Sequence, residues 1–211
     1  MLAPSALLAA AQLRTPDHFQ WPVITLLLLV LHAYVEQARA GRWNVVLGGI
    51  AFWLMDWVNE IVNGLLFHFS GFAPAWSTAG SSAYTVLIGL NVEISLMFAV
   101  MGLIATRLLP DDAQQRWFGL PNRLALAATS SVACVMVELW LHHIGALQWA
   151  WSGWNADRPW LIWLLGYLPF FVVAYAVHDL ASRRRQITVV ATLATAVALA
   201  LYVFGDLLAW I

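Results

Sequence analysis

Acidic and amide side chains occur inside long apolar stretches of this sequence, where ionisable groups are rare. Four of them, Asp56, Asn59, Glu60 and Asn63, are spaced i, i+3, i+4 and i+7, so they share one face of a helix. The next two apolar stretches contain further polar groups: Asn91 and Glu93 in one, and Glu138, His142 and His143 in the other. Ionisable residues within membrane spans indicate a functional site by default.

The four carboxyl groups of Asp56, Glu60, Glu93 and Glu138 are expensive to place in a bilayer. Each charge near the membrane centre costs about 2.5–3.5 kcal/mol, so four ionised groups would cost on the order of 10 kcal/mol. The chain avoids this cost if the acids are protonated, pair with histidine or bind cations. A network that only holds helices together is the structural alternative, but polar contacts between membrane helices contribute roughly 1–2 kcal/mol or less each. We therefore favour a chemical role.

The elements that position these groups are predicted to be transmembrane helices. Of 211 residues, 62% are apolar and 10% are charged, against about 25% charged in a soluble domain. A bilayer core requires roughly 20 apolar residues per helix. The sequence predicts an all-α, polytopic membrane bundle, a single domain over 1–211, with six spans at about 19–38, 43–69, 82–108, 122–145, 159–181 and 186–210. Pro169 is expected to kink the fifth span.

Arginine predicts the orientation of this bundle. Eight arginines fall in the loops between spans one and two, three and four, and five and six, whereas only Arg14 and Arg158 fall on the other side. The sequence therefore predicts a multi-pass protein of the cell membrane, and the positive-inside rule places both of its termini on the outer side of that membrane. The net charge of -1 and the lack of a basic patch exclude nucleic acid as a partner.

With this orientation, the acids of spans two, three and four lie at similar depths, in the outer half of the membrane. A smaller inner set consists of His32, Glu36, His178 and Asp179, and His32 and Glu36 are interpreted as paired with each other or with arginine.

The main hypothesis is a membrane-embedded enzyme that converts a lipid or isoprenoid substrate by acid/base chemistry without a cofactor. A buried carboxylic acid protonates an alkene or epoxide, a second carboxylate removes a proton, and aromatic rings shelter the cation. Glu60 is the predicted acid with Asp56 as its partner, Glu138 with His142 is the counter-base, and Glu93 orients or acts as a second acid. The predicted substrate contacts are Trp57, Asn59, Asn63, Asn91, Trp154 and Asn155.

One segment, Trp57-Val58-Asn59-Glu60-Ile61-Val62, resembles the Trp-Glu-Ile-Val-like segment of small integral-membrane terpene cyclases from meroterpenoid and indole-diterpene pathways, as does Asn91 in the next span. The resemblance implies that Glu60 is the acid, although Asn59 and not Trp precedes it here. A more distant resemblance, to the emopamil-binding sterol-isomerase fold, is carried by Glu93, Glu138 and the stretch containing Trp154, Asn155, Pro159 and Trp160. Both imply a cyclase or isomerase.

Two alternatives stay open. Glu60, Glu93, Glu138 and His142 would offer oxygen and nitrogen ligands to iron, manganese or copper in an oxygenase or desaturase. The same acids would also suit a proton-coupled transporter, and the pairs His32/His178 or His68/His142 would suit a haem protein. The absence of lysine excludes a retinal Schiff base or a lysine nucleophile.

Overall fold

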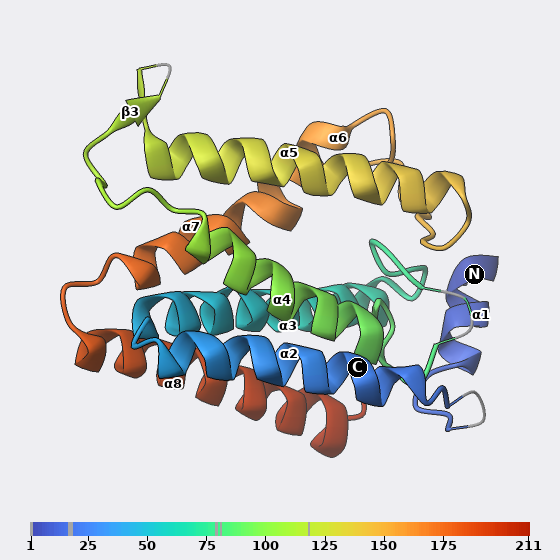
Figure 1. The fold of residues 1–211 in the computed structure, drawn as a ribbon. Coiled ribbons are helices and arrows are strands. Elements are labelled where there is room, and N and C mark those ends of the chain that lie inside the picture. The colour runs from blue at the N-terminus through green and yellow to red at the C-terminus, as the bar shows by residue number, and fades with distance from the viewer. Residues whose placement is uncertain (1, 17–18, 79, 81, 118) are drawn as a thin grey trace.

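The computed structural model describes residues 2–16, 19–78, 80, 82–117 and 119–211, and it is a helical bundle with two short hairpins (Figure 1). The α-helices are α1 (Pro4–Ala11), α2 (Pro22–Arg39), α3 (Trp43–Ser70), α4 (Val92–Arg107), α5 (Asn122–His143), α6 (Pro159–Leu161), α7 (Leu168–His178) and α8 (Arg183–Ala200). Two π-helical segments, η1 (Ile162–Tyr167) and η2 (Leu201–Leu207), follow α6 and α8. The hairpins pair β1 (Thr85–Leu87) with β2 (Leu90–Asn91) and β3 (Arg116–Trp117) with β4 (Leu120–Pro121).

Helix ends follow the local sequence. Proline occupies the first turn of α2, where its missing N–H would be unpaired in any case. The side chains of Asn91 and Ser182 accept hydrogen bonds from the backbone N–H groups of Ile94 and Arg185 and so cap α4 and α8. Gly71 ends α3 in the left-handed conformation, with φ of 57°.

The third predicted span is shorter than expected. Residues 85–91 form the β1–β2 hairpin, and α4 begins only at Val92. Its 16 residues extend about 24 Å, less than a hydrocarbon core of about 30 Å. The predicted start at residue 82 was therefore wrong, because apolarity alone does not distinguish a buried hairpin from a helix.

Pro169 is accommodated by a π-helical turn. Proline has no N–H, so it leaves the carbonyl one turn earlier without its usual helical partner. The chain widens into η1 over the preceding turn and returns to α-helix in α7. Such wide turns are frequent at functional sites.

Helix α3 is the centre of the bundle and packs against α2, α4, α7 and α8. Gly102 of α4 allows a close crossing, because a Cβ there would lie 2.6 Å from the carbonyl oxygen of Gly49 in α3. Helix α5 packs mainly on α7 and η1. It also contacts α4, since Sγ of Cys134 in α5 lies 3.7 Å from Sδ of Met101 in α4.

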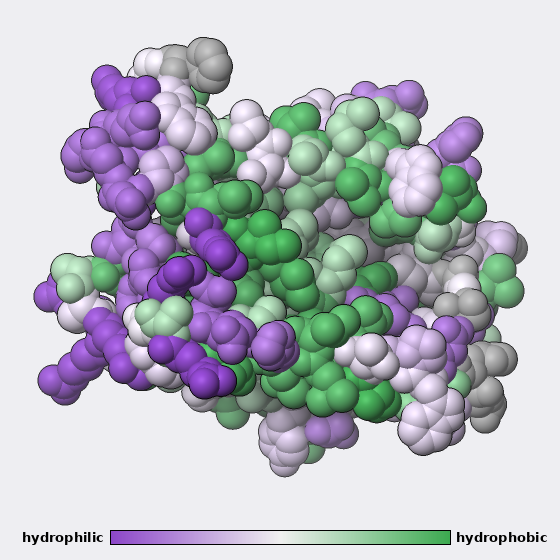
Figure 2. All heavy atoms as spheres, viewed as in Figure 1, coloured by the Kyte–Doolittle hydropathy of each residue, from purple (hydrophilic) through white to green (hydrophobic). Residues whose placement is uncertain are grey.

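Four helical stretches are long and apolar enough to cross a membrane: Trp43–Ser70, Asn122–His143, Pro159–His178 and Arg183–Leu207. Figure 2 shows apolar residues over the middle of the visible face, whereas hydrophilic residues gather at the end that carries the β3 hairpin and the α7–α8 turn in Figure 1. An apolar middle with polar residues at one end is the surface expected of a protein that spans a bilayer.

Candidate functional site

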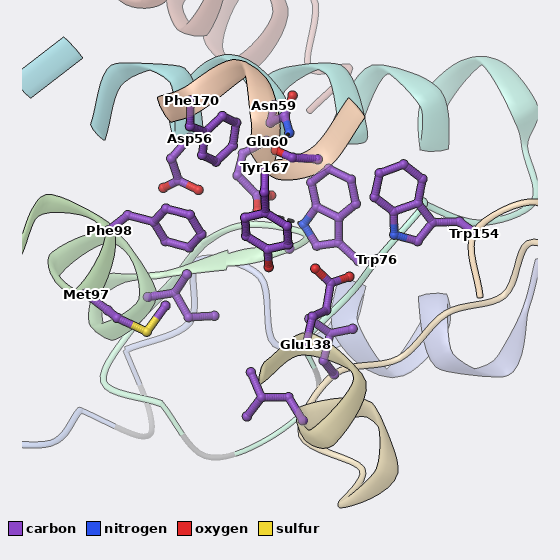
Figure 3. Close-up of a pocket in the computed structure, with 15 residues that line it drawn as sticks. Asp56, Asn59, Glu60, Trp76, Met97, Phe98, Glu138, Trp154, Tyr167 and Phe170 are labelled. Atoms are coloured by element: carbon purple, nitrogen blue, oxygen red, sulfur yellow. Dashed lines mark hydrogen bonds between the residues drawn. The ribbon is translucent and has the colours of Figure 1, made fainter. Parts of the chain in front are cut away.

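A cavity of about 70 Å³ lies between α3, α4, α5 and η1. Three acids line it, Asp56 and Glu60 from α3 and Glu138 from α5 (Figure 3). The remaining walls are mainly aromatic and apolar: Asn59, Trp76, Gly89, Ile94, Met97, Phe98, Leu141, Leu147, Trp154, Gly166, Tyr167 and Phe170. The structure thus brings carboxyl groups from two helices to one small space.

Glu60 is held by an indole. Its side chain is almost fully buried, and its Oε1 accepts a hydrogen bond of 2.7 Å from Nε1–H of Trp76. Its Oε2 is buried and has no hydrogen-bond partner among the described residues. Gly89 lies beside both groups, since a Cβ at this position would be 2.6 Å from that oxygen. One carboxyl oxygen is therefore anchored, and the other lies against Gly89 without a hydrogen-bond partner among the described residues.

Asp56 lies one helical turn before Glu60 on the same face of α3. It is also almost fully buried, and its Oδ2 has no hydrogen-bond partner within the described part of the chain. A buried polar atom without a partner is unusual in a folded protein. Two such oxygens at one cavity are typical of a site that binds or transfers a proton or a ligand.

Glu138 faces the cavity from α5, and the hydroxyl of Tyr167 points towards it (Figure 3). Its Oε1 accepts a hydrogen bond of 3.0 Å from Nε1–H of Trp149. The Trp149 ring stacks on His142 at a centroid distance of 4.0 Å, and Nδ1 of His142 lies 3.1 Å from the carbonyl oxygen of Leu147. His142 does not line the cavity, and its ring stacks on the indole that donates to Glu138.

The aromatic wall presents several ring faces. Trp76 and Trp154 lie at a centroid distance of 5.3 Å and an interplanar angle of 34°, and Phe98 is parallel to Tyr167 at 6.4 Å. Nε1 of Trp154 is buried without a partner in the described chain. These rings can stabilise a positive charge through their π faces.

Two asparagines of α3 form hydrogen bonds to the backbone of residues that line the cavity. Asn63 is 1% exposed; its Nδ2 donates to the carbonyl oxygen of Trp76, and its Oδ1 accepts from the N–H groups of Ala75 and Trp76. Asn59 donates to the carbonyl oxygen of Gly166 in η1 at 3.1 Å. Asn63 thus positions Trp76 over Glu60, whereas Asn59 lines the cavity itself.

Four other predicted site residues lie outside this cavity. Asn91 caps α4, and Glu93 lines a different hollow on the surface of α4. Trp57 packs into the apolar core around Leu54 and Ile61. Asn155 shapes a surface turn through bonds to Ser152 and Asp157. The common depth of these residues did not bring them together, because depth does not specify the direction in which a side chain points.

Trp76, Tyr167, Phe98 and Phe170 were not predicted to line the site. Trp76 lies in a loop whose position depends on Asn63. Tyr167 faces inward because the π-helical turn changes the helical register before Pro169. Pro169, which was expected to kink this span, was the sequence signal for this rearrangement.

Neither the metal ligands nor the outer pair of haem ligands considered from the sequence come together in the described part of the chain. Among the residues that the structure describes, no group of three or more His, Cys, Asp or Glu side chains could hold a metal ion. Glu93 is separated from Glu60 and Glu138 by its position in the other hollow. His68 stacks on Trp210 at 4.8 Å, whereas His142 stacks on Trp149, so the outer histidines do not face each other.

The inner polar residues also lie in separate local contacts and not in one cluster. Glu36 lies 3.8 Å from Arg39 in an exposed ion pair, as expected. Asp179 accepts hydrogen bonds of 2.8 and 3.1 Å from Arg123, and its Oδ1 lies 2.8 Å from Nδ1 of His178. Burial raises the pKa of Asp179, but the hydrogen bonds and charges of Arg123 and His178 outweigh it and lower that pKa below its usual value.

One comparison with known proteins identifies a family of membrane proteins. A family described as an uncharacterized membrane protein family matches residues 3–206. A protein of Archaeoglobus fulgidus, described as uncharacterized, is 47% identical over 203 residues, 96% of each chain. A second from the same organism is 43% identical over 53 residues, which are 25% of this chain and 95% of its own. No solved structure matches significantly.

These matches correct the resemblance to small terpene cyclases and to the emopamil-binding fold, which was wrong: the matched family and the relative over nearly the whole chain carry no link to either. The structure gives a physical reason, because Trp57 packs in the core and Asn91 caps a helix, so neither reaches the cavity. With its apolar membrane-crossing helices, the chain is a multi-pass membrane protein and belongs to the uncharacterized membrane protein family whose model matches residues 3–206.

Proposed function

We propose that the protein is a membrane-embedded enzyme that shifts a double bond in an apolar lipid, isoprenoid in kind, by carboxylate acid/base chemistry. One observation carries this proposal: Asp56, Glu60 and Glu138 share one small cavity, and two of their buried oxygens have no partner among the described residues. A purely structural polar network would pair these oxygens.

The reaction needs no co-reactant. The carboxylic acid of Glu60 gives its proton to one carbon of a C=C bond, and the electron pair of that bond forms the new C–H bond. The neighbouring carbon becomes a cation, sheltered by Trp76, Trp154 and Tyr167. The Glu138 carboxylate then removes a proton from the next carbon, and the C–H electrons form the shifted double bond. Asp56, one turn from Glu60, then passes a proton from water to Glu60, and Glu138 gives up its proton to water, so that each acid returns to its starting state.

The size of the cavity limits what it holds. A volume of about 70 Å³ is enough for a few water molecules, since a cavity needs about 10–15 Å³ to hold one. Only the reacting segment of a lipid fits, and the rest of the chain must extend outside. Met97 of α4 lines the cavity and is 47% exposed, which marks a side exit towards the membrane.

We also propose six spans, α2, α3, α4, α5, η1 with α7, and α8 with η2, with both termini outside. The support is the arginine distribution and the hydrophilic end of the bundle opposite α1 (Figures 1 and 2). The short α4 would cross a locally thinned bilayer.

The experiment compares membrane lipids from cells that produce the wild-type protein, Glu60→Gln or, as a matched control, the exposed Glu36→Gln. Isomerisation conserves mass, so we expect the ratio of two isobaric lipids to change with the wild type and Glu36→Gln but not with Glu60→Gln. The proposal fails if no isobaric pair changes, or if Glu60→Gln, present at equal amounts, produces the same change.

A proton-coupled transporter is the second candidate, favoured by the succession of Asp56 and Glu60 along one face inside the membrane. It predicts a pH change inside proteoliposomes under a proton gradient, without a change in lipid composition. The isomerase predicts a change in lipid composition and no pH change inside the proteoliposomes.

A further inference from the structure

Another hollow, of about 600 Å³, lies at the end of the bundle that carries the β3 hairpin and the α7–α8 turn (Figure 1). The residues that line it come from the start of α3, the end of α4, the start of α5 and the end of α7. Three of them are arginines, Arg42, Arg107 and Arg123. We call this hollow the arginine hollow. None of its lining residues belongs to the cavity of the three acids.

One wall of the arginine hollow is a connected set of side chains. Arg123 donates to both carboxylate oxygens of Asp179, and its Nη1 donates to the carbonyl oxygen of Pro110 at 2.8 Å. Asp179 also contacts Nδ1 of His178, whose Nε2 lies 2.8 Å from Nδ2 of Asn44. The charge of Arg123 is therefore balanced by Asp179, and this wall is held in place by its own contacts.

The charges of the other two arginines are not balanced in this way. Arg42 and Arg107 are exposed, and neither forms an ion pair with a described residue. Arg42 donates to Oε1 of Gln37 at 3.2 Å, but this acceptor is neutral. Asp111, the remaining acid of the lining, also lacks an ion pair within the described part of the chain. The unpaired charges are thus two arginines against one aspartate, which favours an anionic ligand.

Helices α3 and α4 bring Arg42 and Arg107 close together. Arg42 immediately precedes α3, and Arg107 is the last residue of α4. The hydroxyl of Thr106, next to Arg107, donates at 3.1 Å to the carbonyl oxygen of Val45, three residues after Arg42. Because an arginine has a long stem, both guanidinium groups can reach one ligand in the hollow that they line.

We propose that the arginine hollow binds a phosphate group, carried by a lipid or free in solution, between Arg42 and Arg107. A guanidinium group forms two parallel hydrogen bonds to phosphate oxygens. Phosphate has more oxygens than a carboxylate, so it can accept from both arginines at once. Basic pockets between membrane helices are typical sites for lipid headgroups. The inference does not depend on the proposed isomerisation, since it uses no residue of the acid cavity.

The first test is native mass spectrometry of the detergent-solubilised protein with dioleoyl phosphatidic acid and with dioleoylglycerol, which has the same chains but no phosphate. We expect the wild type to retain phosphatidic acid about tenfold better. Arg42→Gln and Arg107→Gln should each lower this retention about tenfold, because each removes charge-assisted hydrogen bonds. Arg39→Gln is the matched control, because Arg39 lies outside the hollow and its side chain is 78% exposed; it should bind as the wild type does.

Equilibrium dialysis against radiolabelled inorganic phosphate separates the two sources of the group. Binding of the lipid alone identifies a headgroup as the ligand, whereas binding of the free ion identifies a soluble source as sufficient. Asp111→Asn removes the opposing charge, so binding should rise severalfold, a gain that misfolding cannot produce. The proposal is overturned if the wild type binds neither ligand, if Arg42→Gln and Arg107→Gln bind as well as Arg39→Gln, or if Asp111→Asn weakens binding.

Discussion

Replacing Gly89 by alanine should break the contact that anchors Glu60. Gly89 lies in the turn between β1 and β2, directly beside the Trp76–Glu60 hydrogen bond. A Cβ at this position would be 2.5 Å from Nε1 of Trp76 and 2.6 Å from Oε2 of Glu60. Both distances are shorter than van der Waals contact, so the indole, the carboxyl group or the turn must move.

The expected cost combines two effects. One extra methyl group in a packed interior costs about 1–3 kcal/mol. Loss of the hydrogen bond from Trp76 adds about 1–2 kcal/mol. Together they should lower the free energy of unfolding by about 2–5 kcal/mol, or the unfolding midpoint by on the order of 10 °C.

Thermal unfolding in detergent, followed by tryptophan fluorescence, measures this change. Gly153→Ala is the matched control, because no atom lies within 4 Å of a Cβ there, and it should unfold as the wild type does. Combining Gly89→Ala with Trp76→Phe should cost less than the sum of the two single changes, because the smaller ring relieves the contact. A Gly89→Ala protein as stable as the control, with unchanged lipid ratios, would refute the described packing around Glu60.

Three further predictions concern the support of the site and the inner end. Asn63→Leu should destabilise the protein by about 2–4 kcal/mol, because it leaves the backbone groups of Ala75 and Trp76 unpaired. Limited proteolysis should then cut the 72–78 loop faster than in the wild type, and unchanged cleavage would contradict the role of Asn63. Trp149→Phe keeps a ring beside His142 but removes the hydrogen bond to Glu138. The change in the isobaric lipid ratio should then slow about tenfold, with little effect on the unfolding midpoint. An unchanged rate would argue against a role for Glu138. The pKa of Asp179 is lowered in the folded protein. Its stabilising contribution is therefore present above the ordinary aspartate pKa of about 4 and is lost as the pH falls through the lowered value. Unfolding midpoints measured from pH 6 to pH 3 should fall more for the wild type than for Asp179→Asn, and parallel curves would contradict the assignment.

The acids of α3 and α5 were predictable because helical spacing is a local property. Asp56 and Glu60 are four residues apart, so any helix places them on one face. A membrane helix cannot readily direct acids towards lipid, so Glu138 was also expected to face inward. The cavity contains all three.

The residues around the acids depend on long-range contacts that no local pattern contains. Trp76 reaches Glu60 because Asn63, thirteen positions earlier in the sequence, holds its backbone. Tyr167 depends on the wide turn before Pro169, where the sequence predicted only a kink. Glu93 lies elsewhere because the β1–β2 hairpin replaces the start of the third predicted span.

The most direct measurement of the central claim is isotope transfer from solvent to the lipid. Purified protein is incubated in D₂O with a lipid extract of the expression host, and neutral and polar lipids are then examined by mass spectrometry. If Glu60 protonates a double bond and Glu138 removes a different proton, the isomer formed should carry one deuteron on carbon, and Glu60→Gln should form none. An isomer formed without deuterium, or equal deuterium incorporation by Glu60→Gln, would contradict proton transfer by the acids of this cavity.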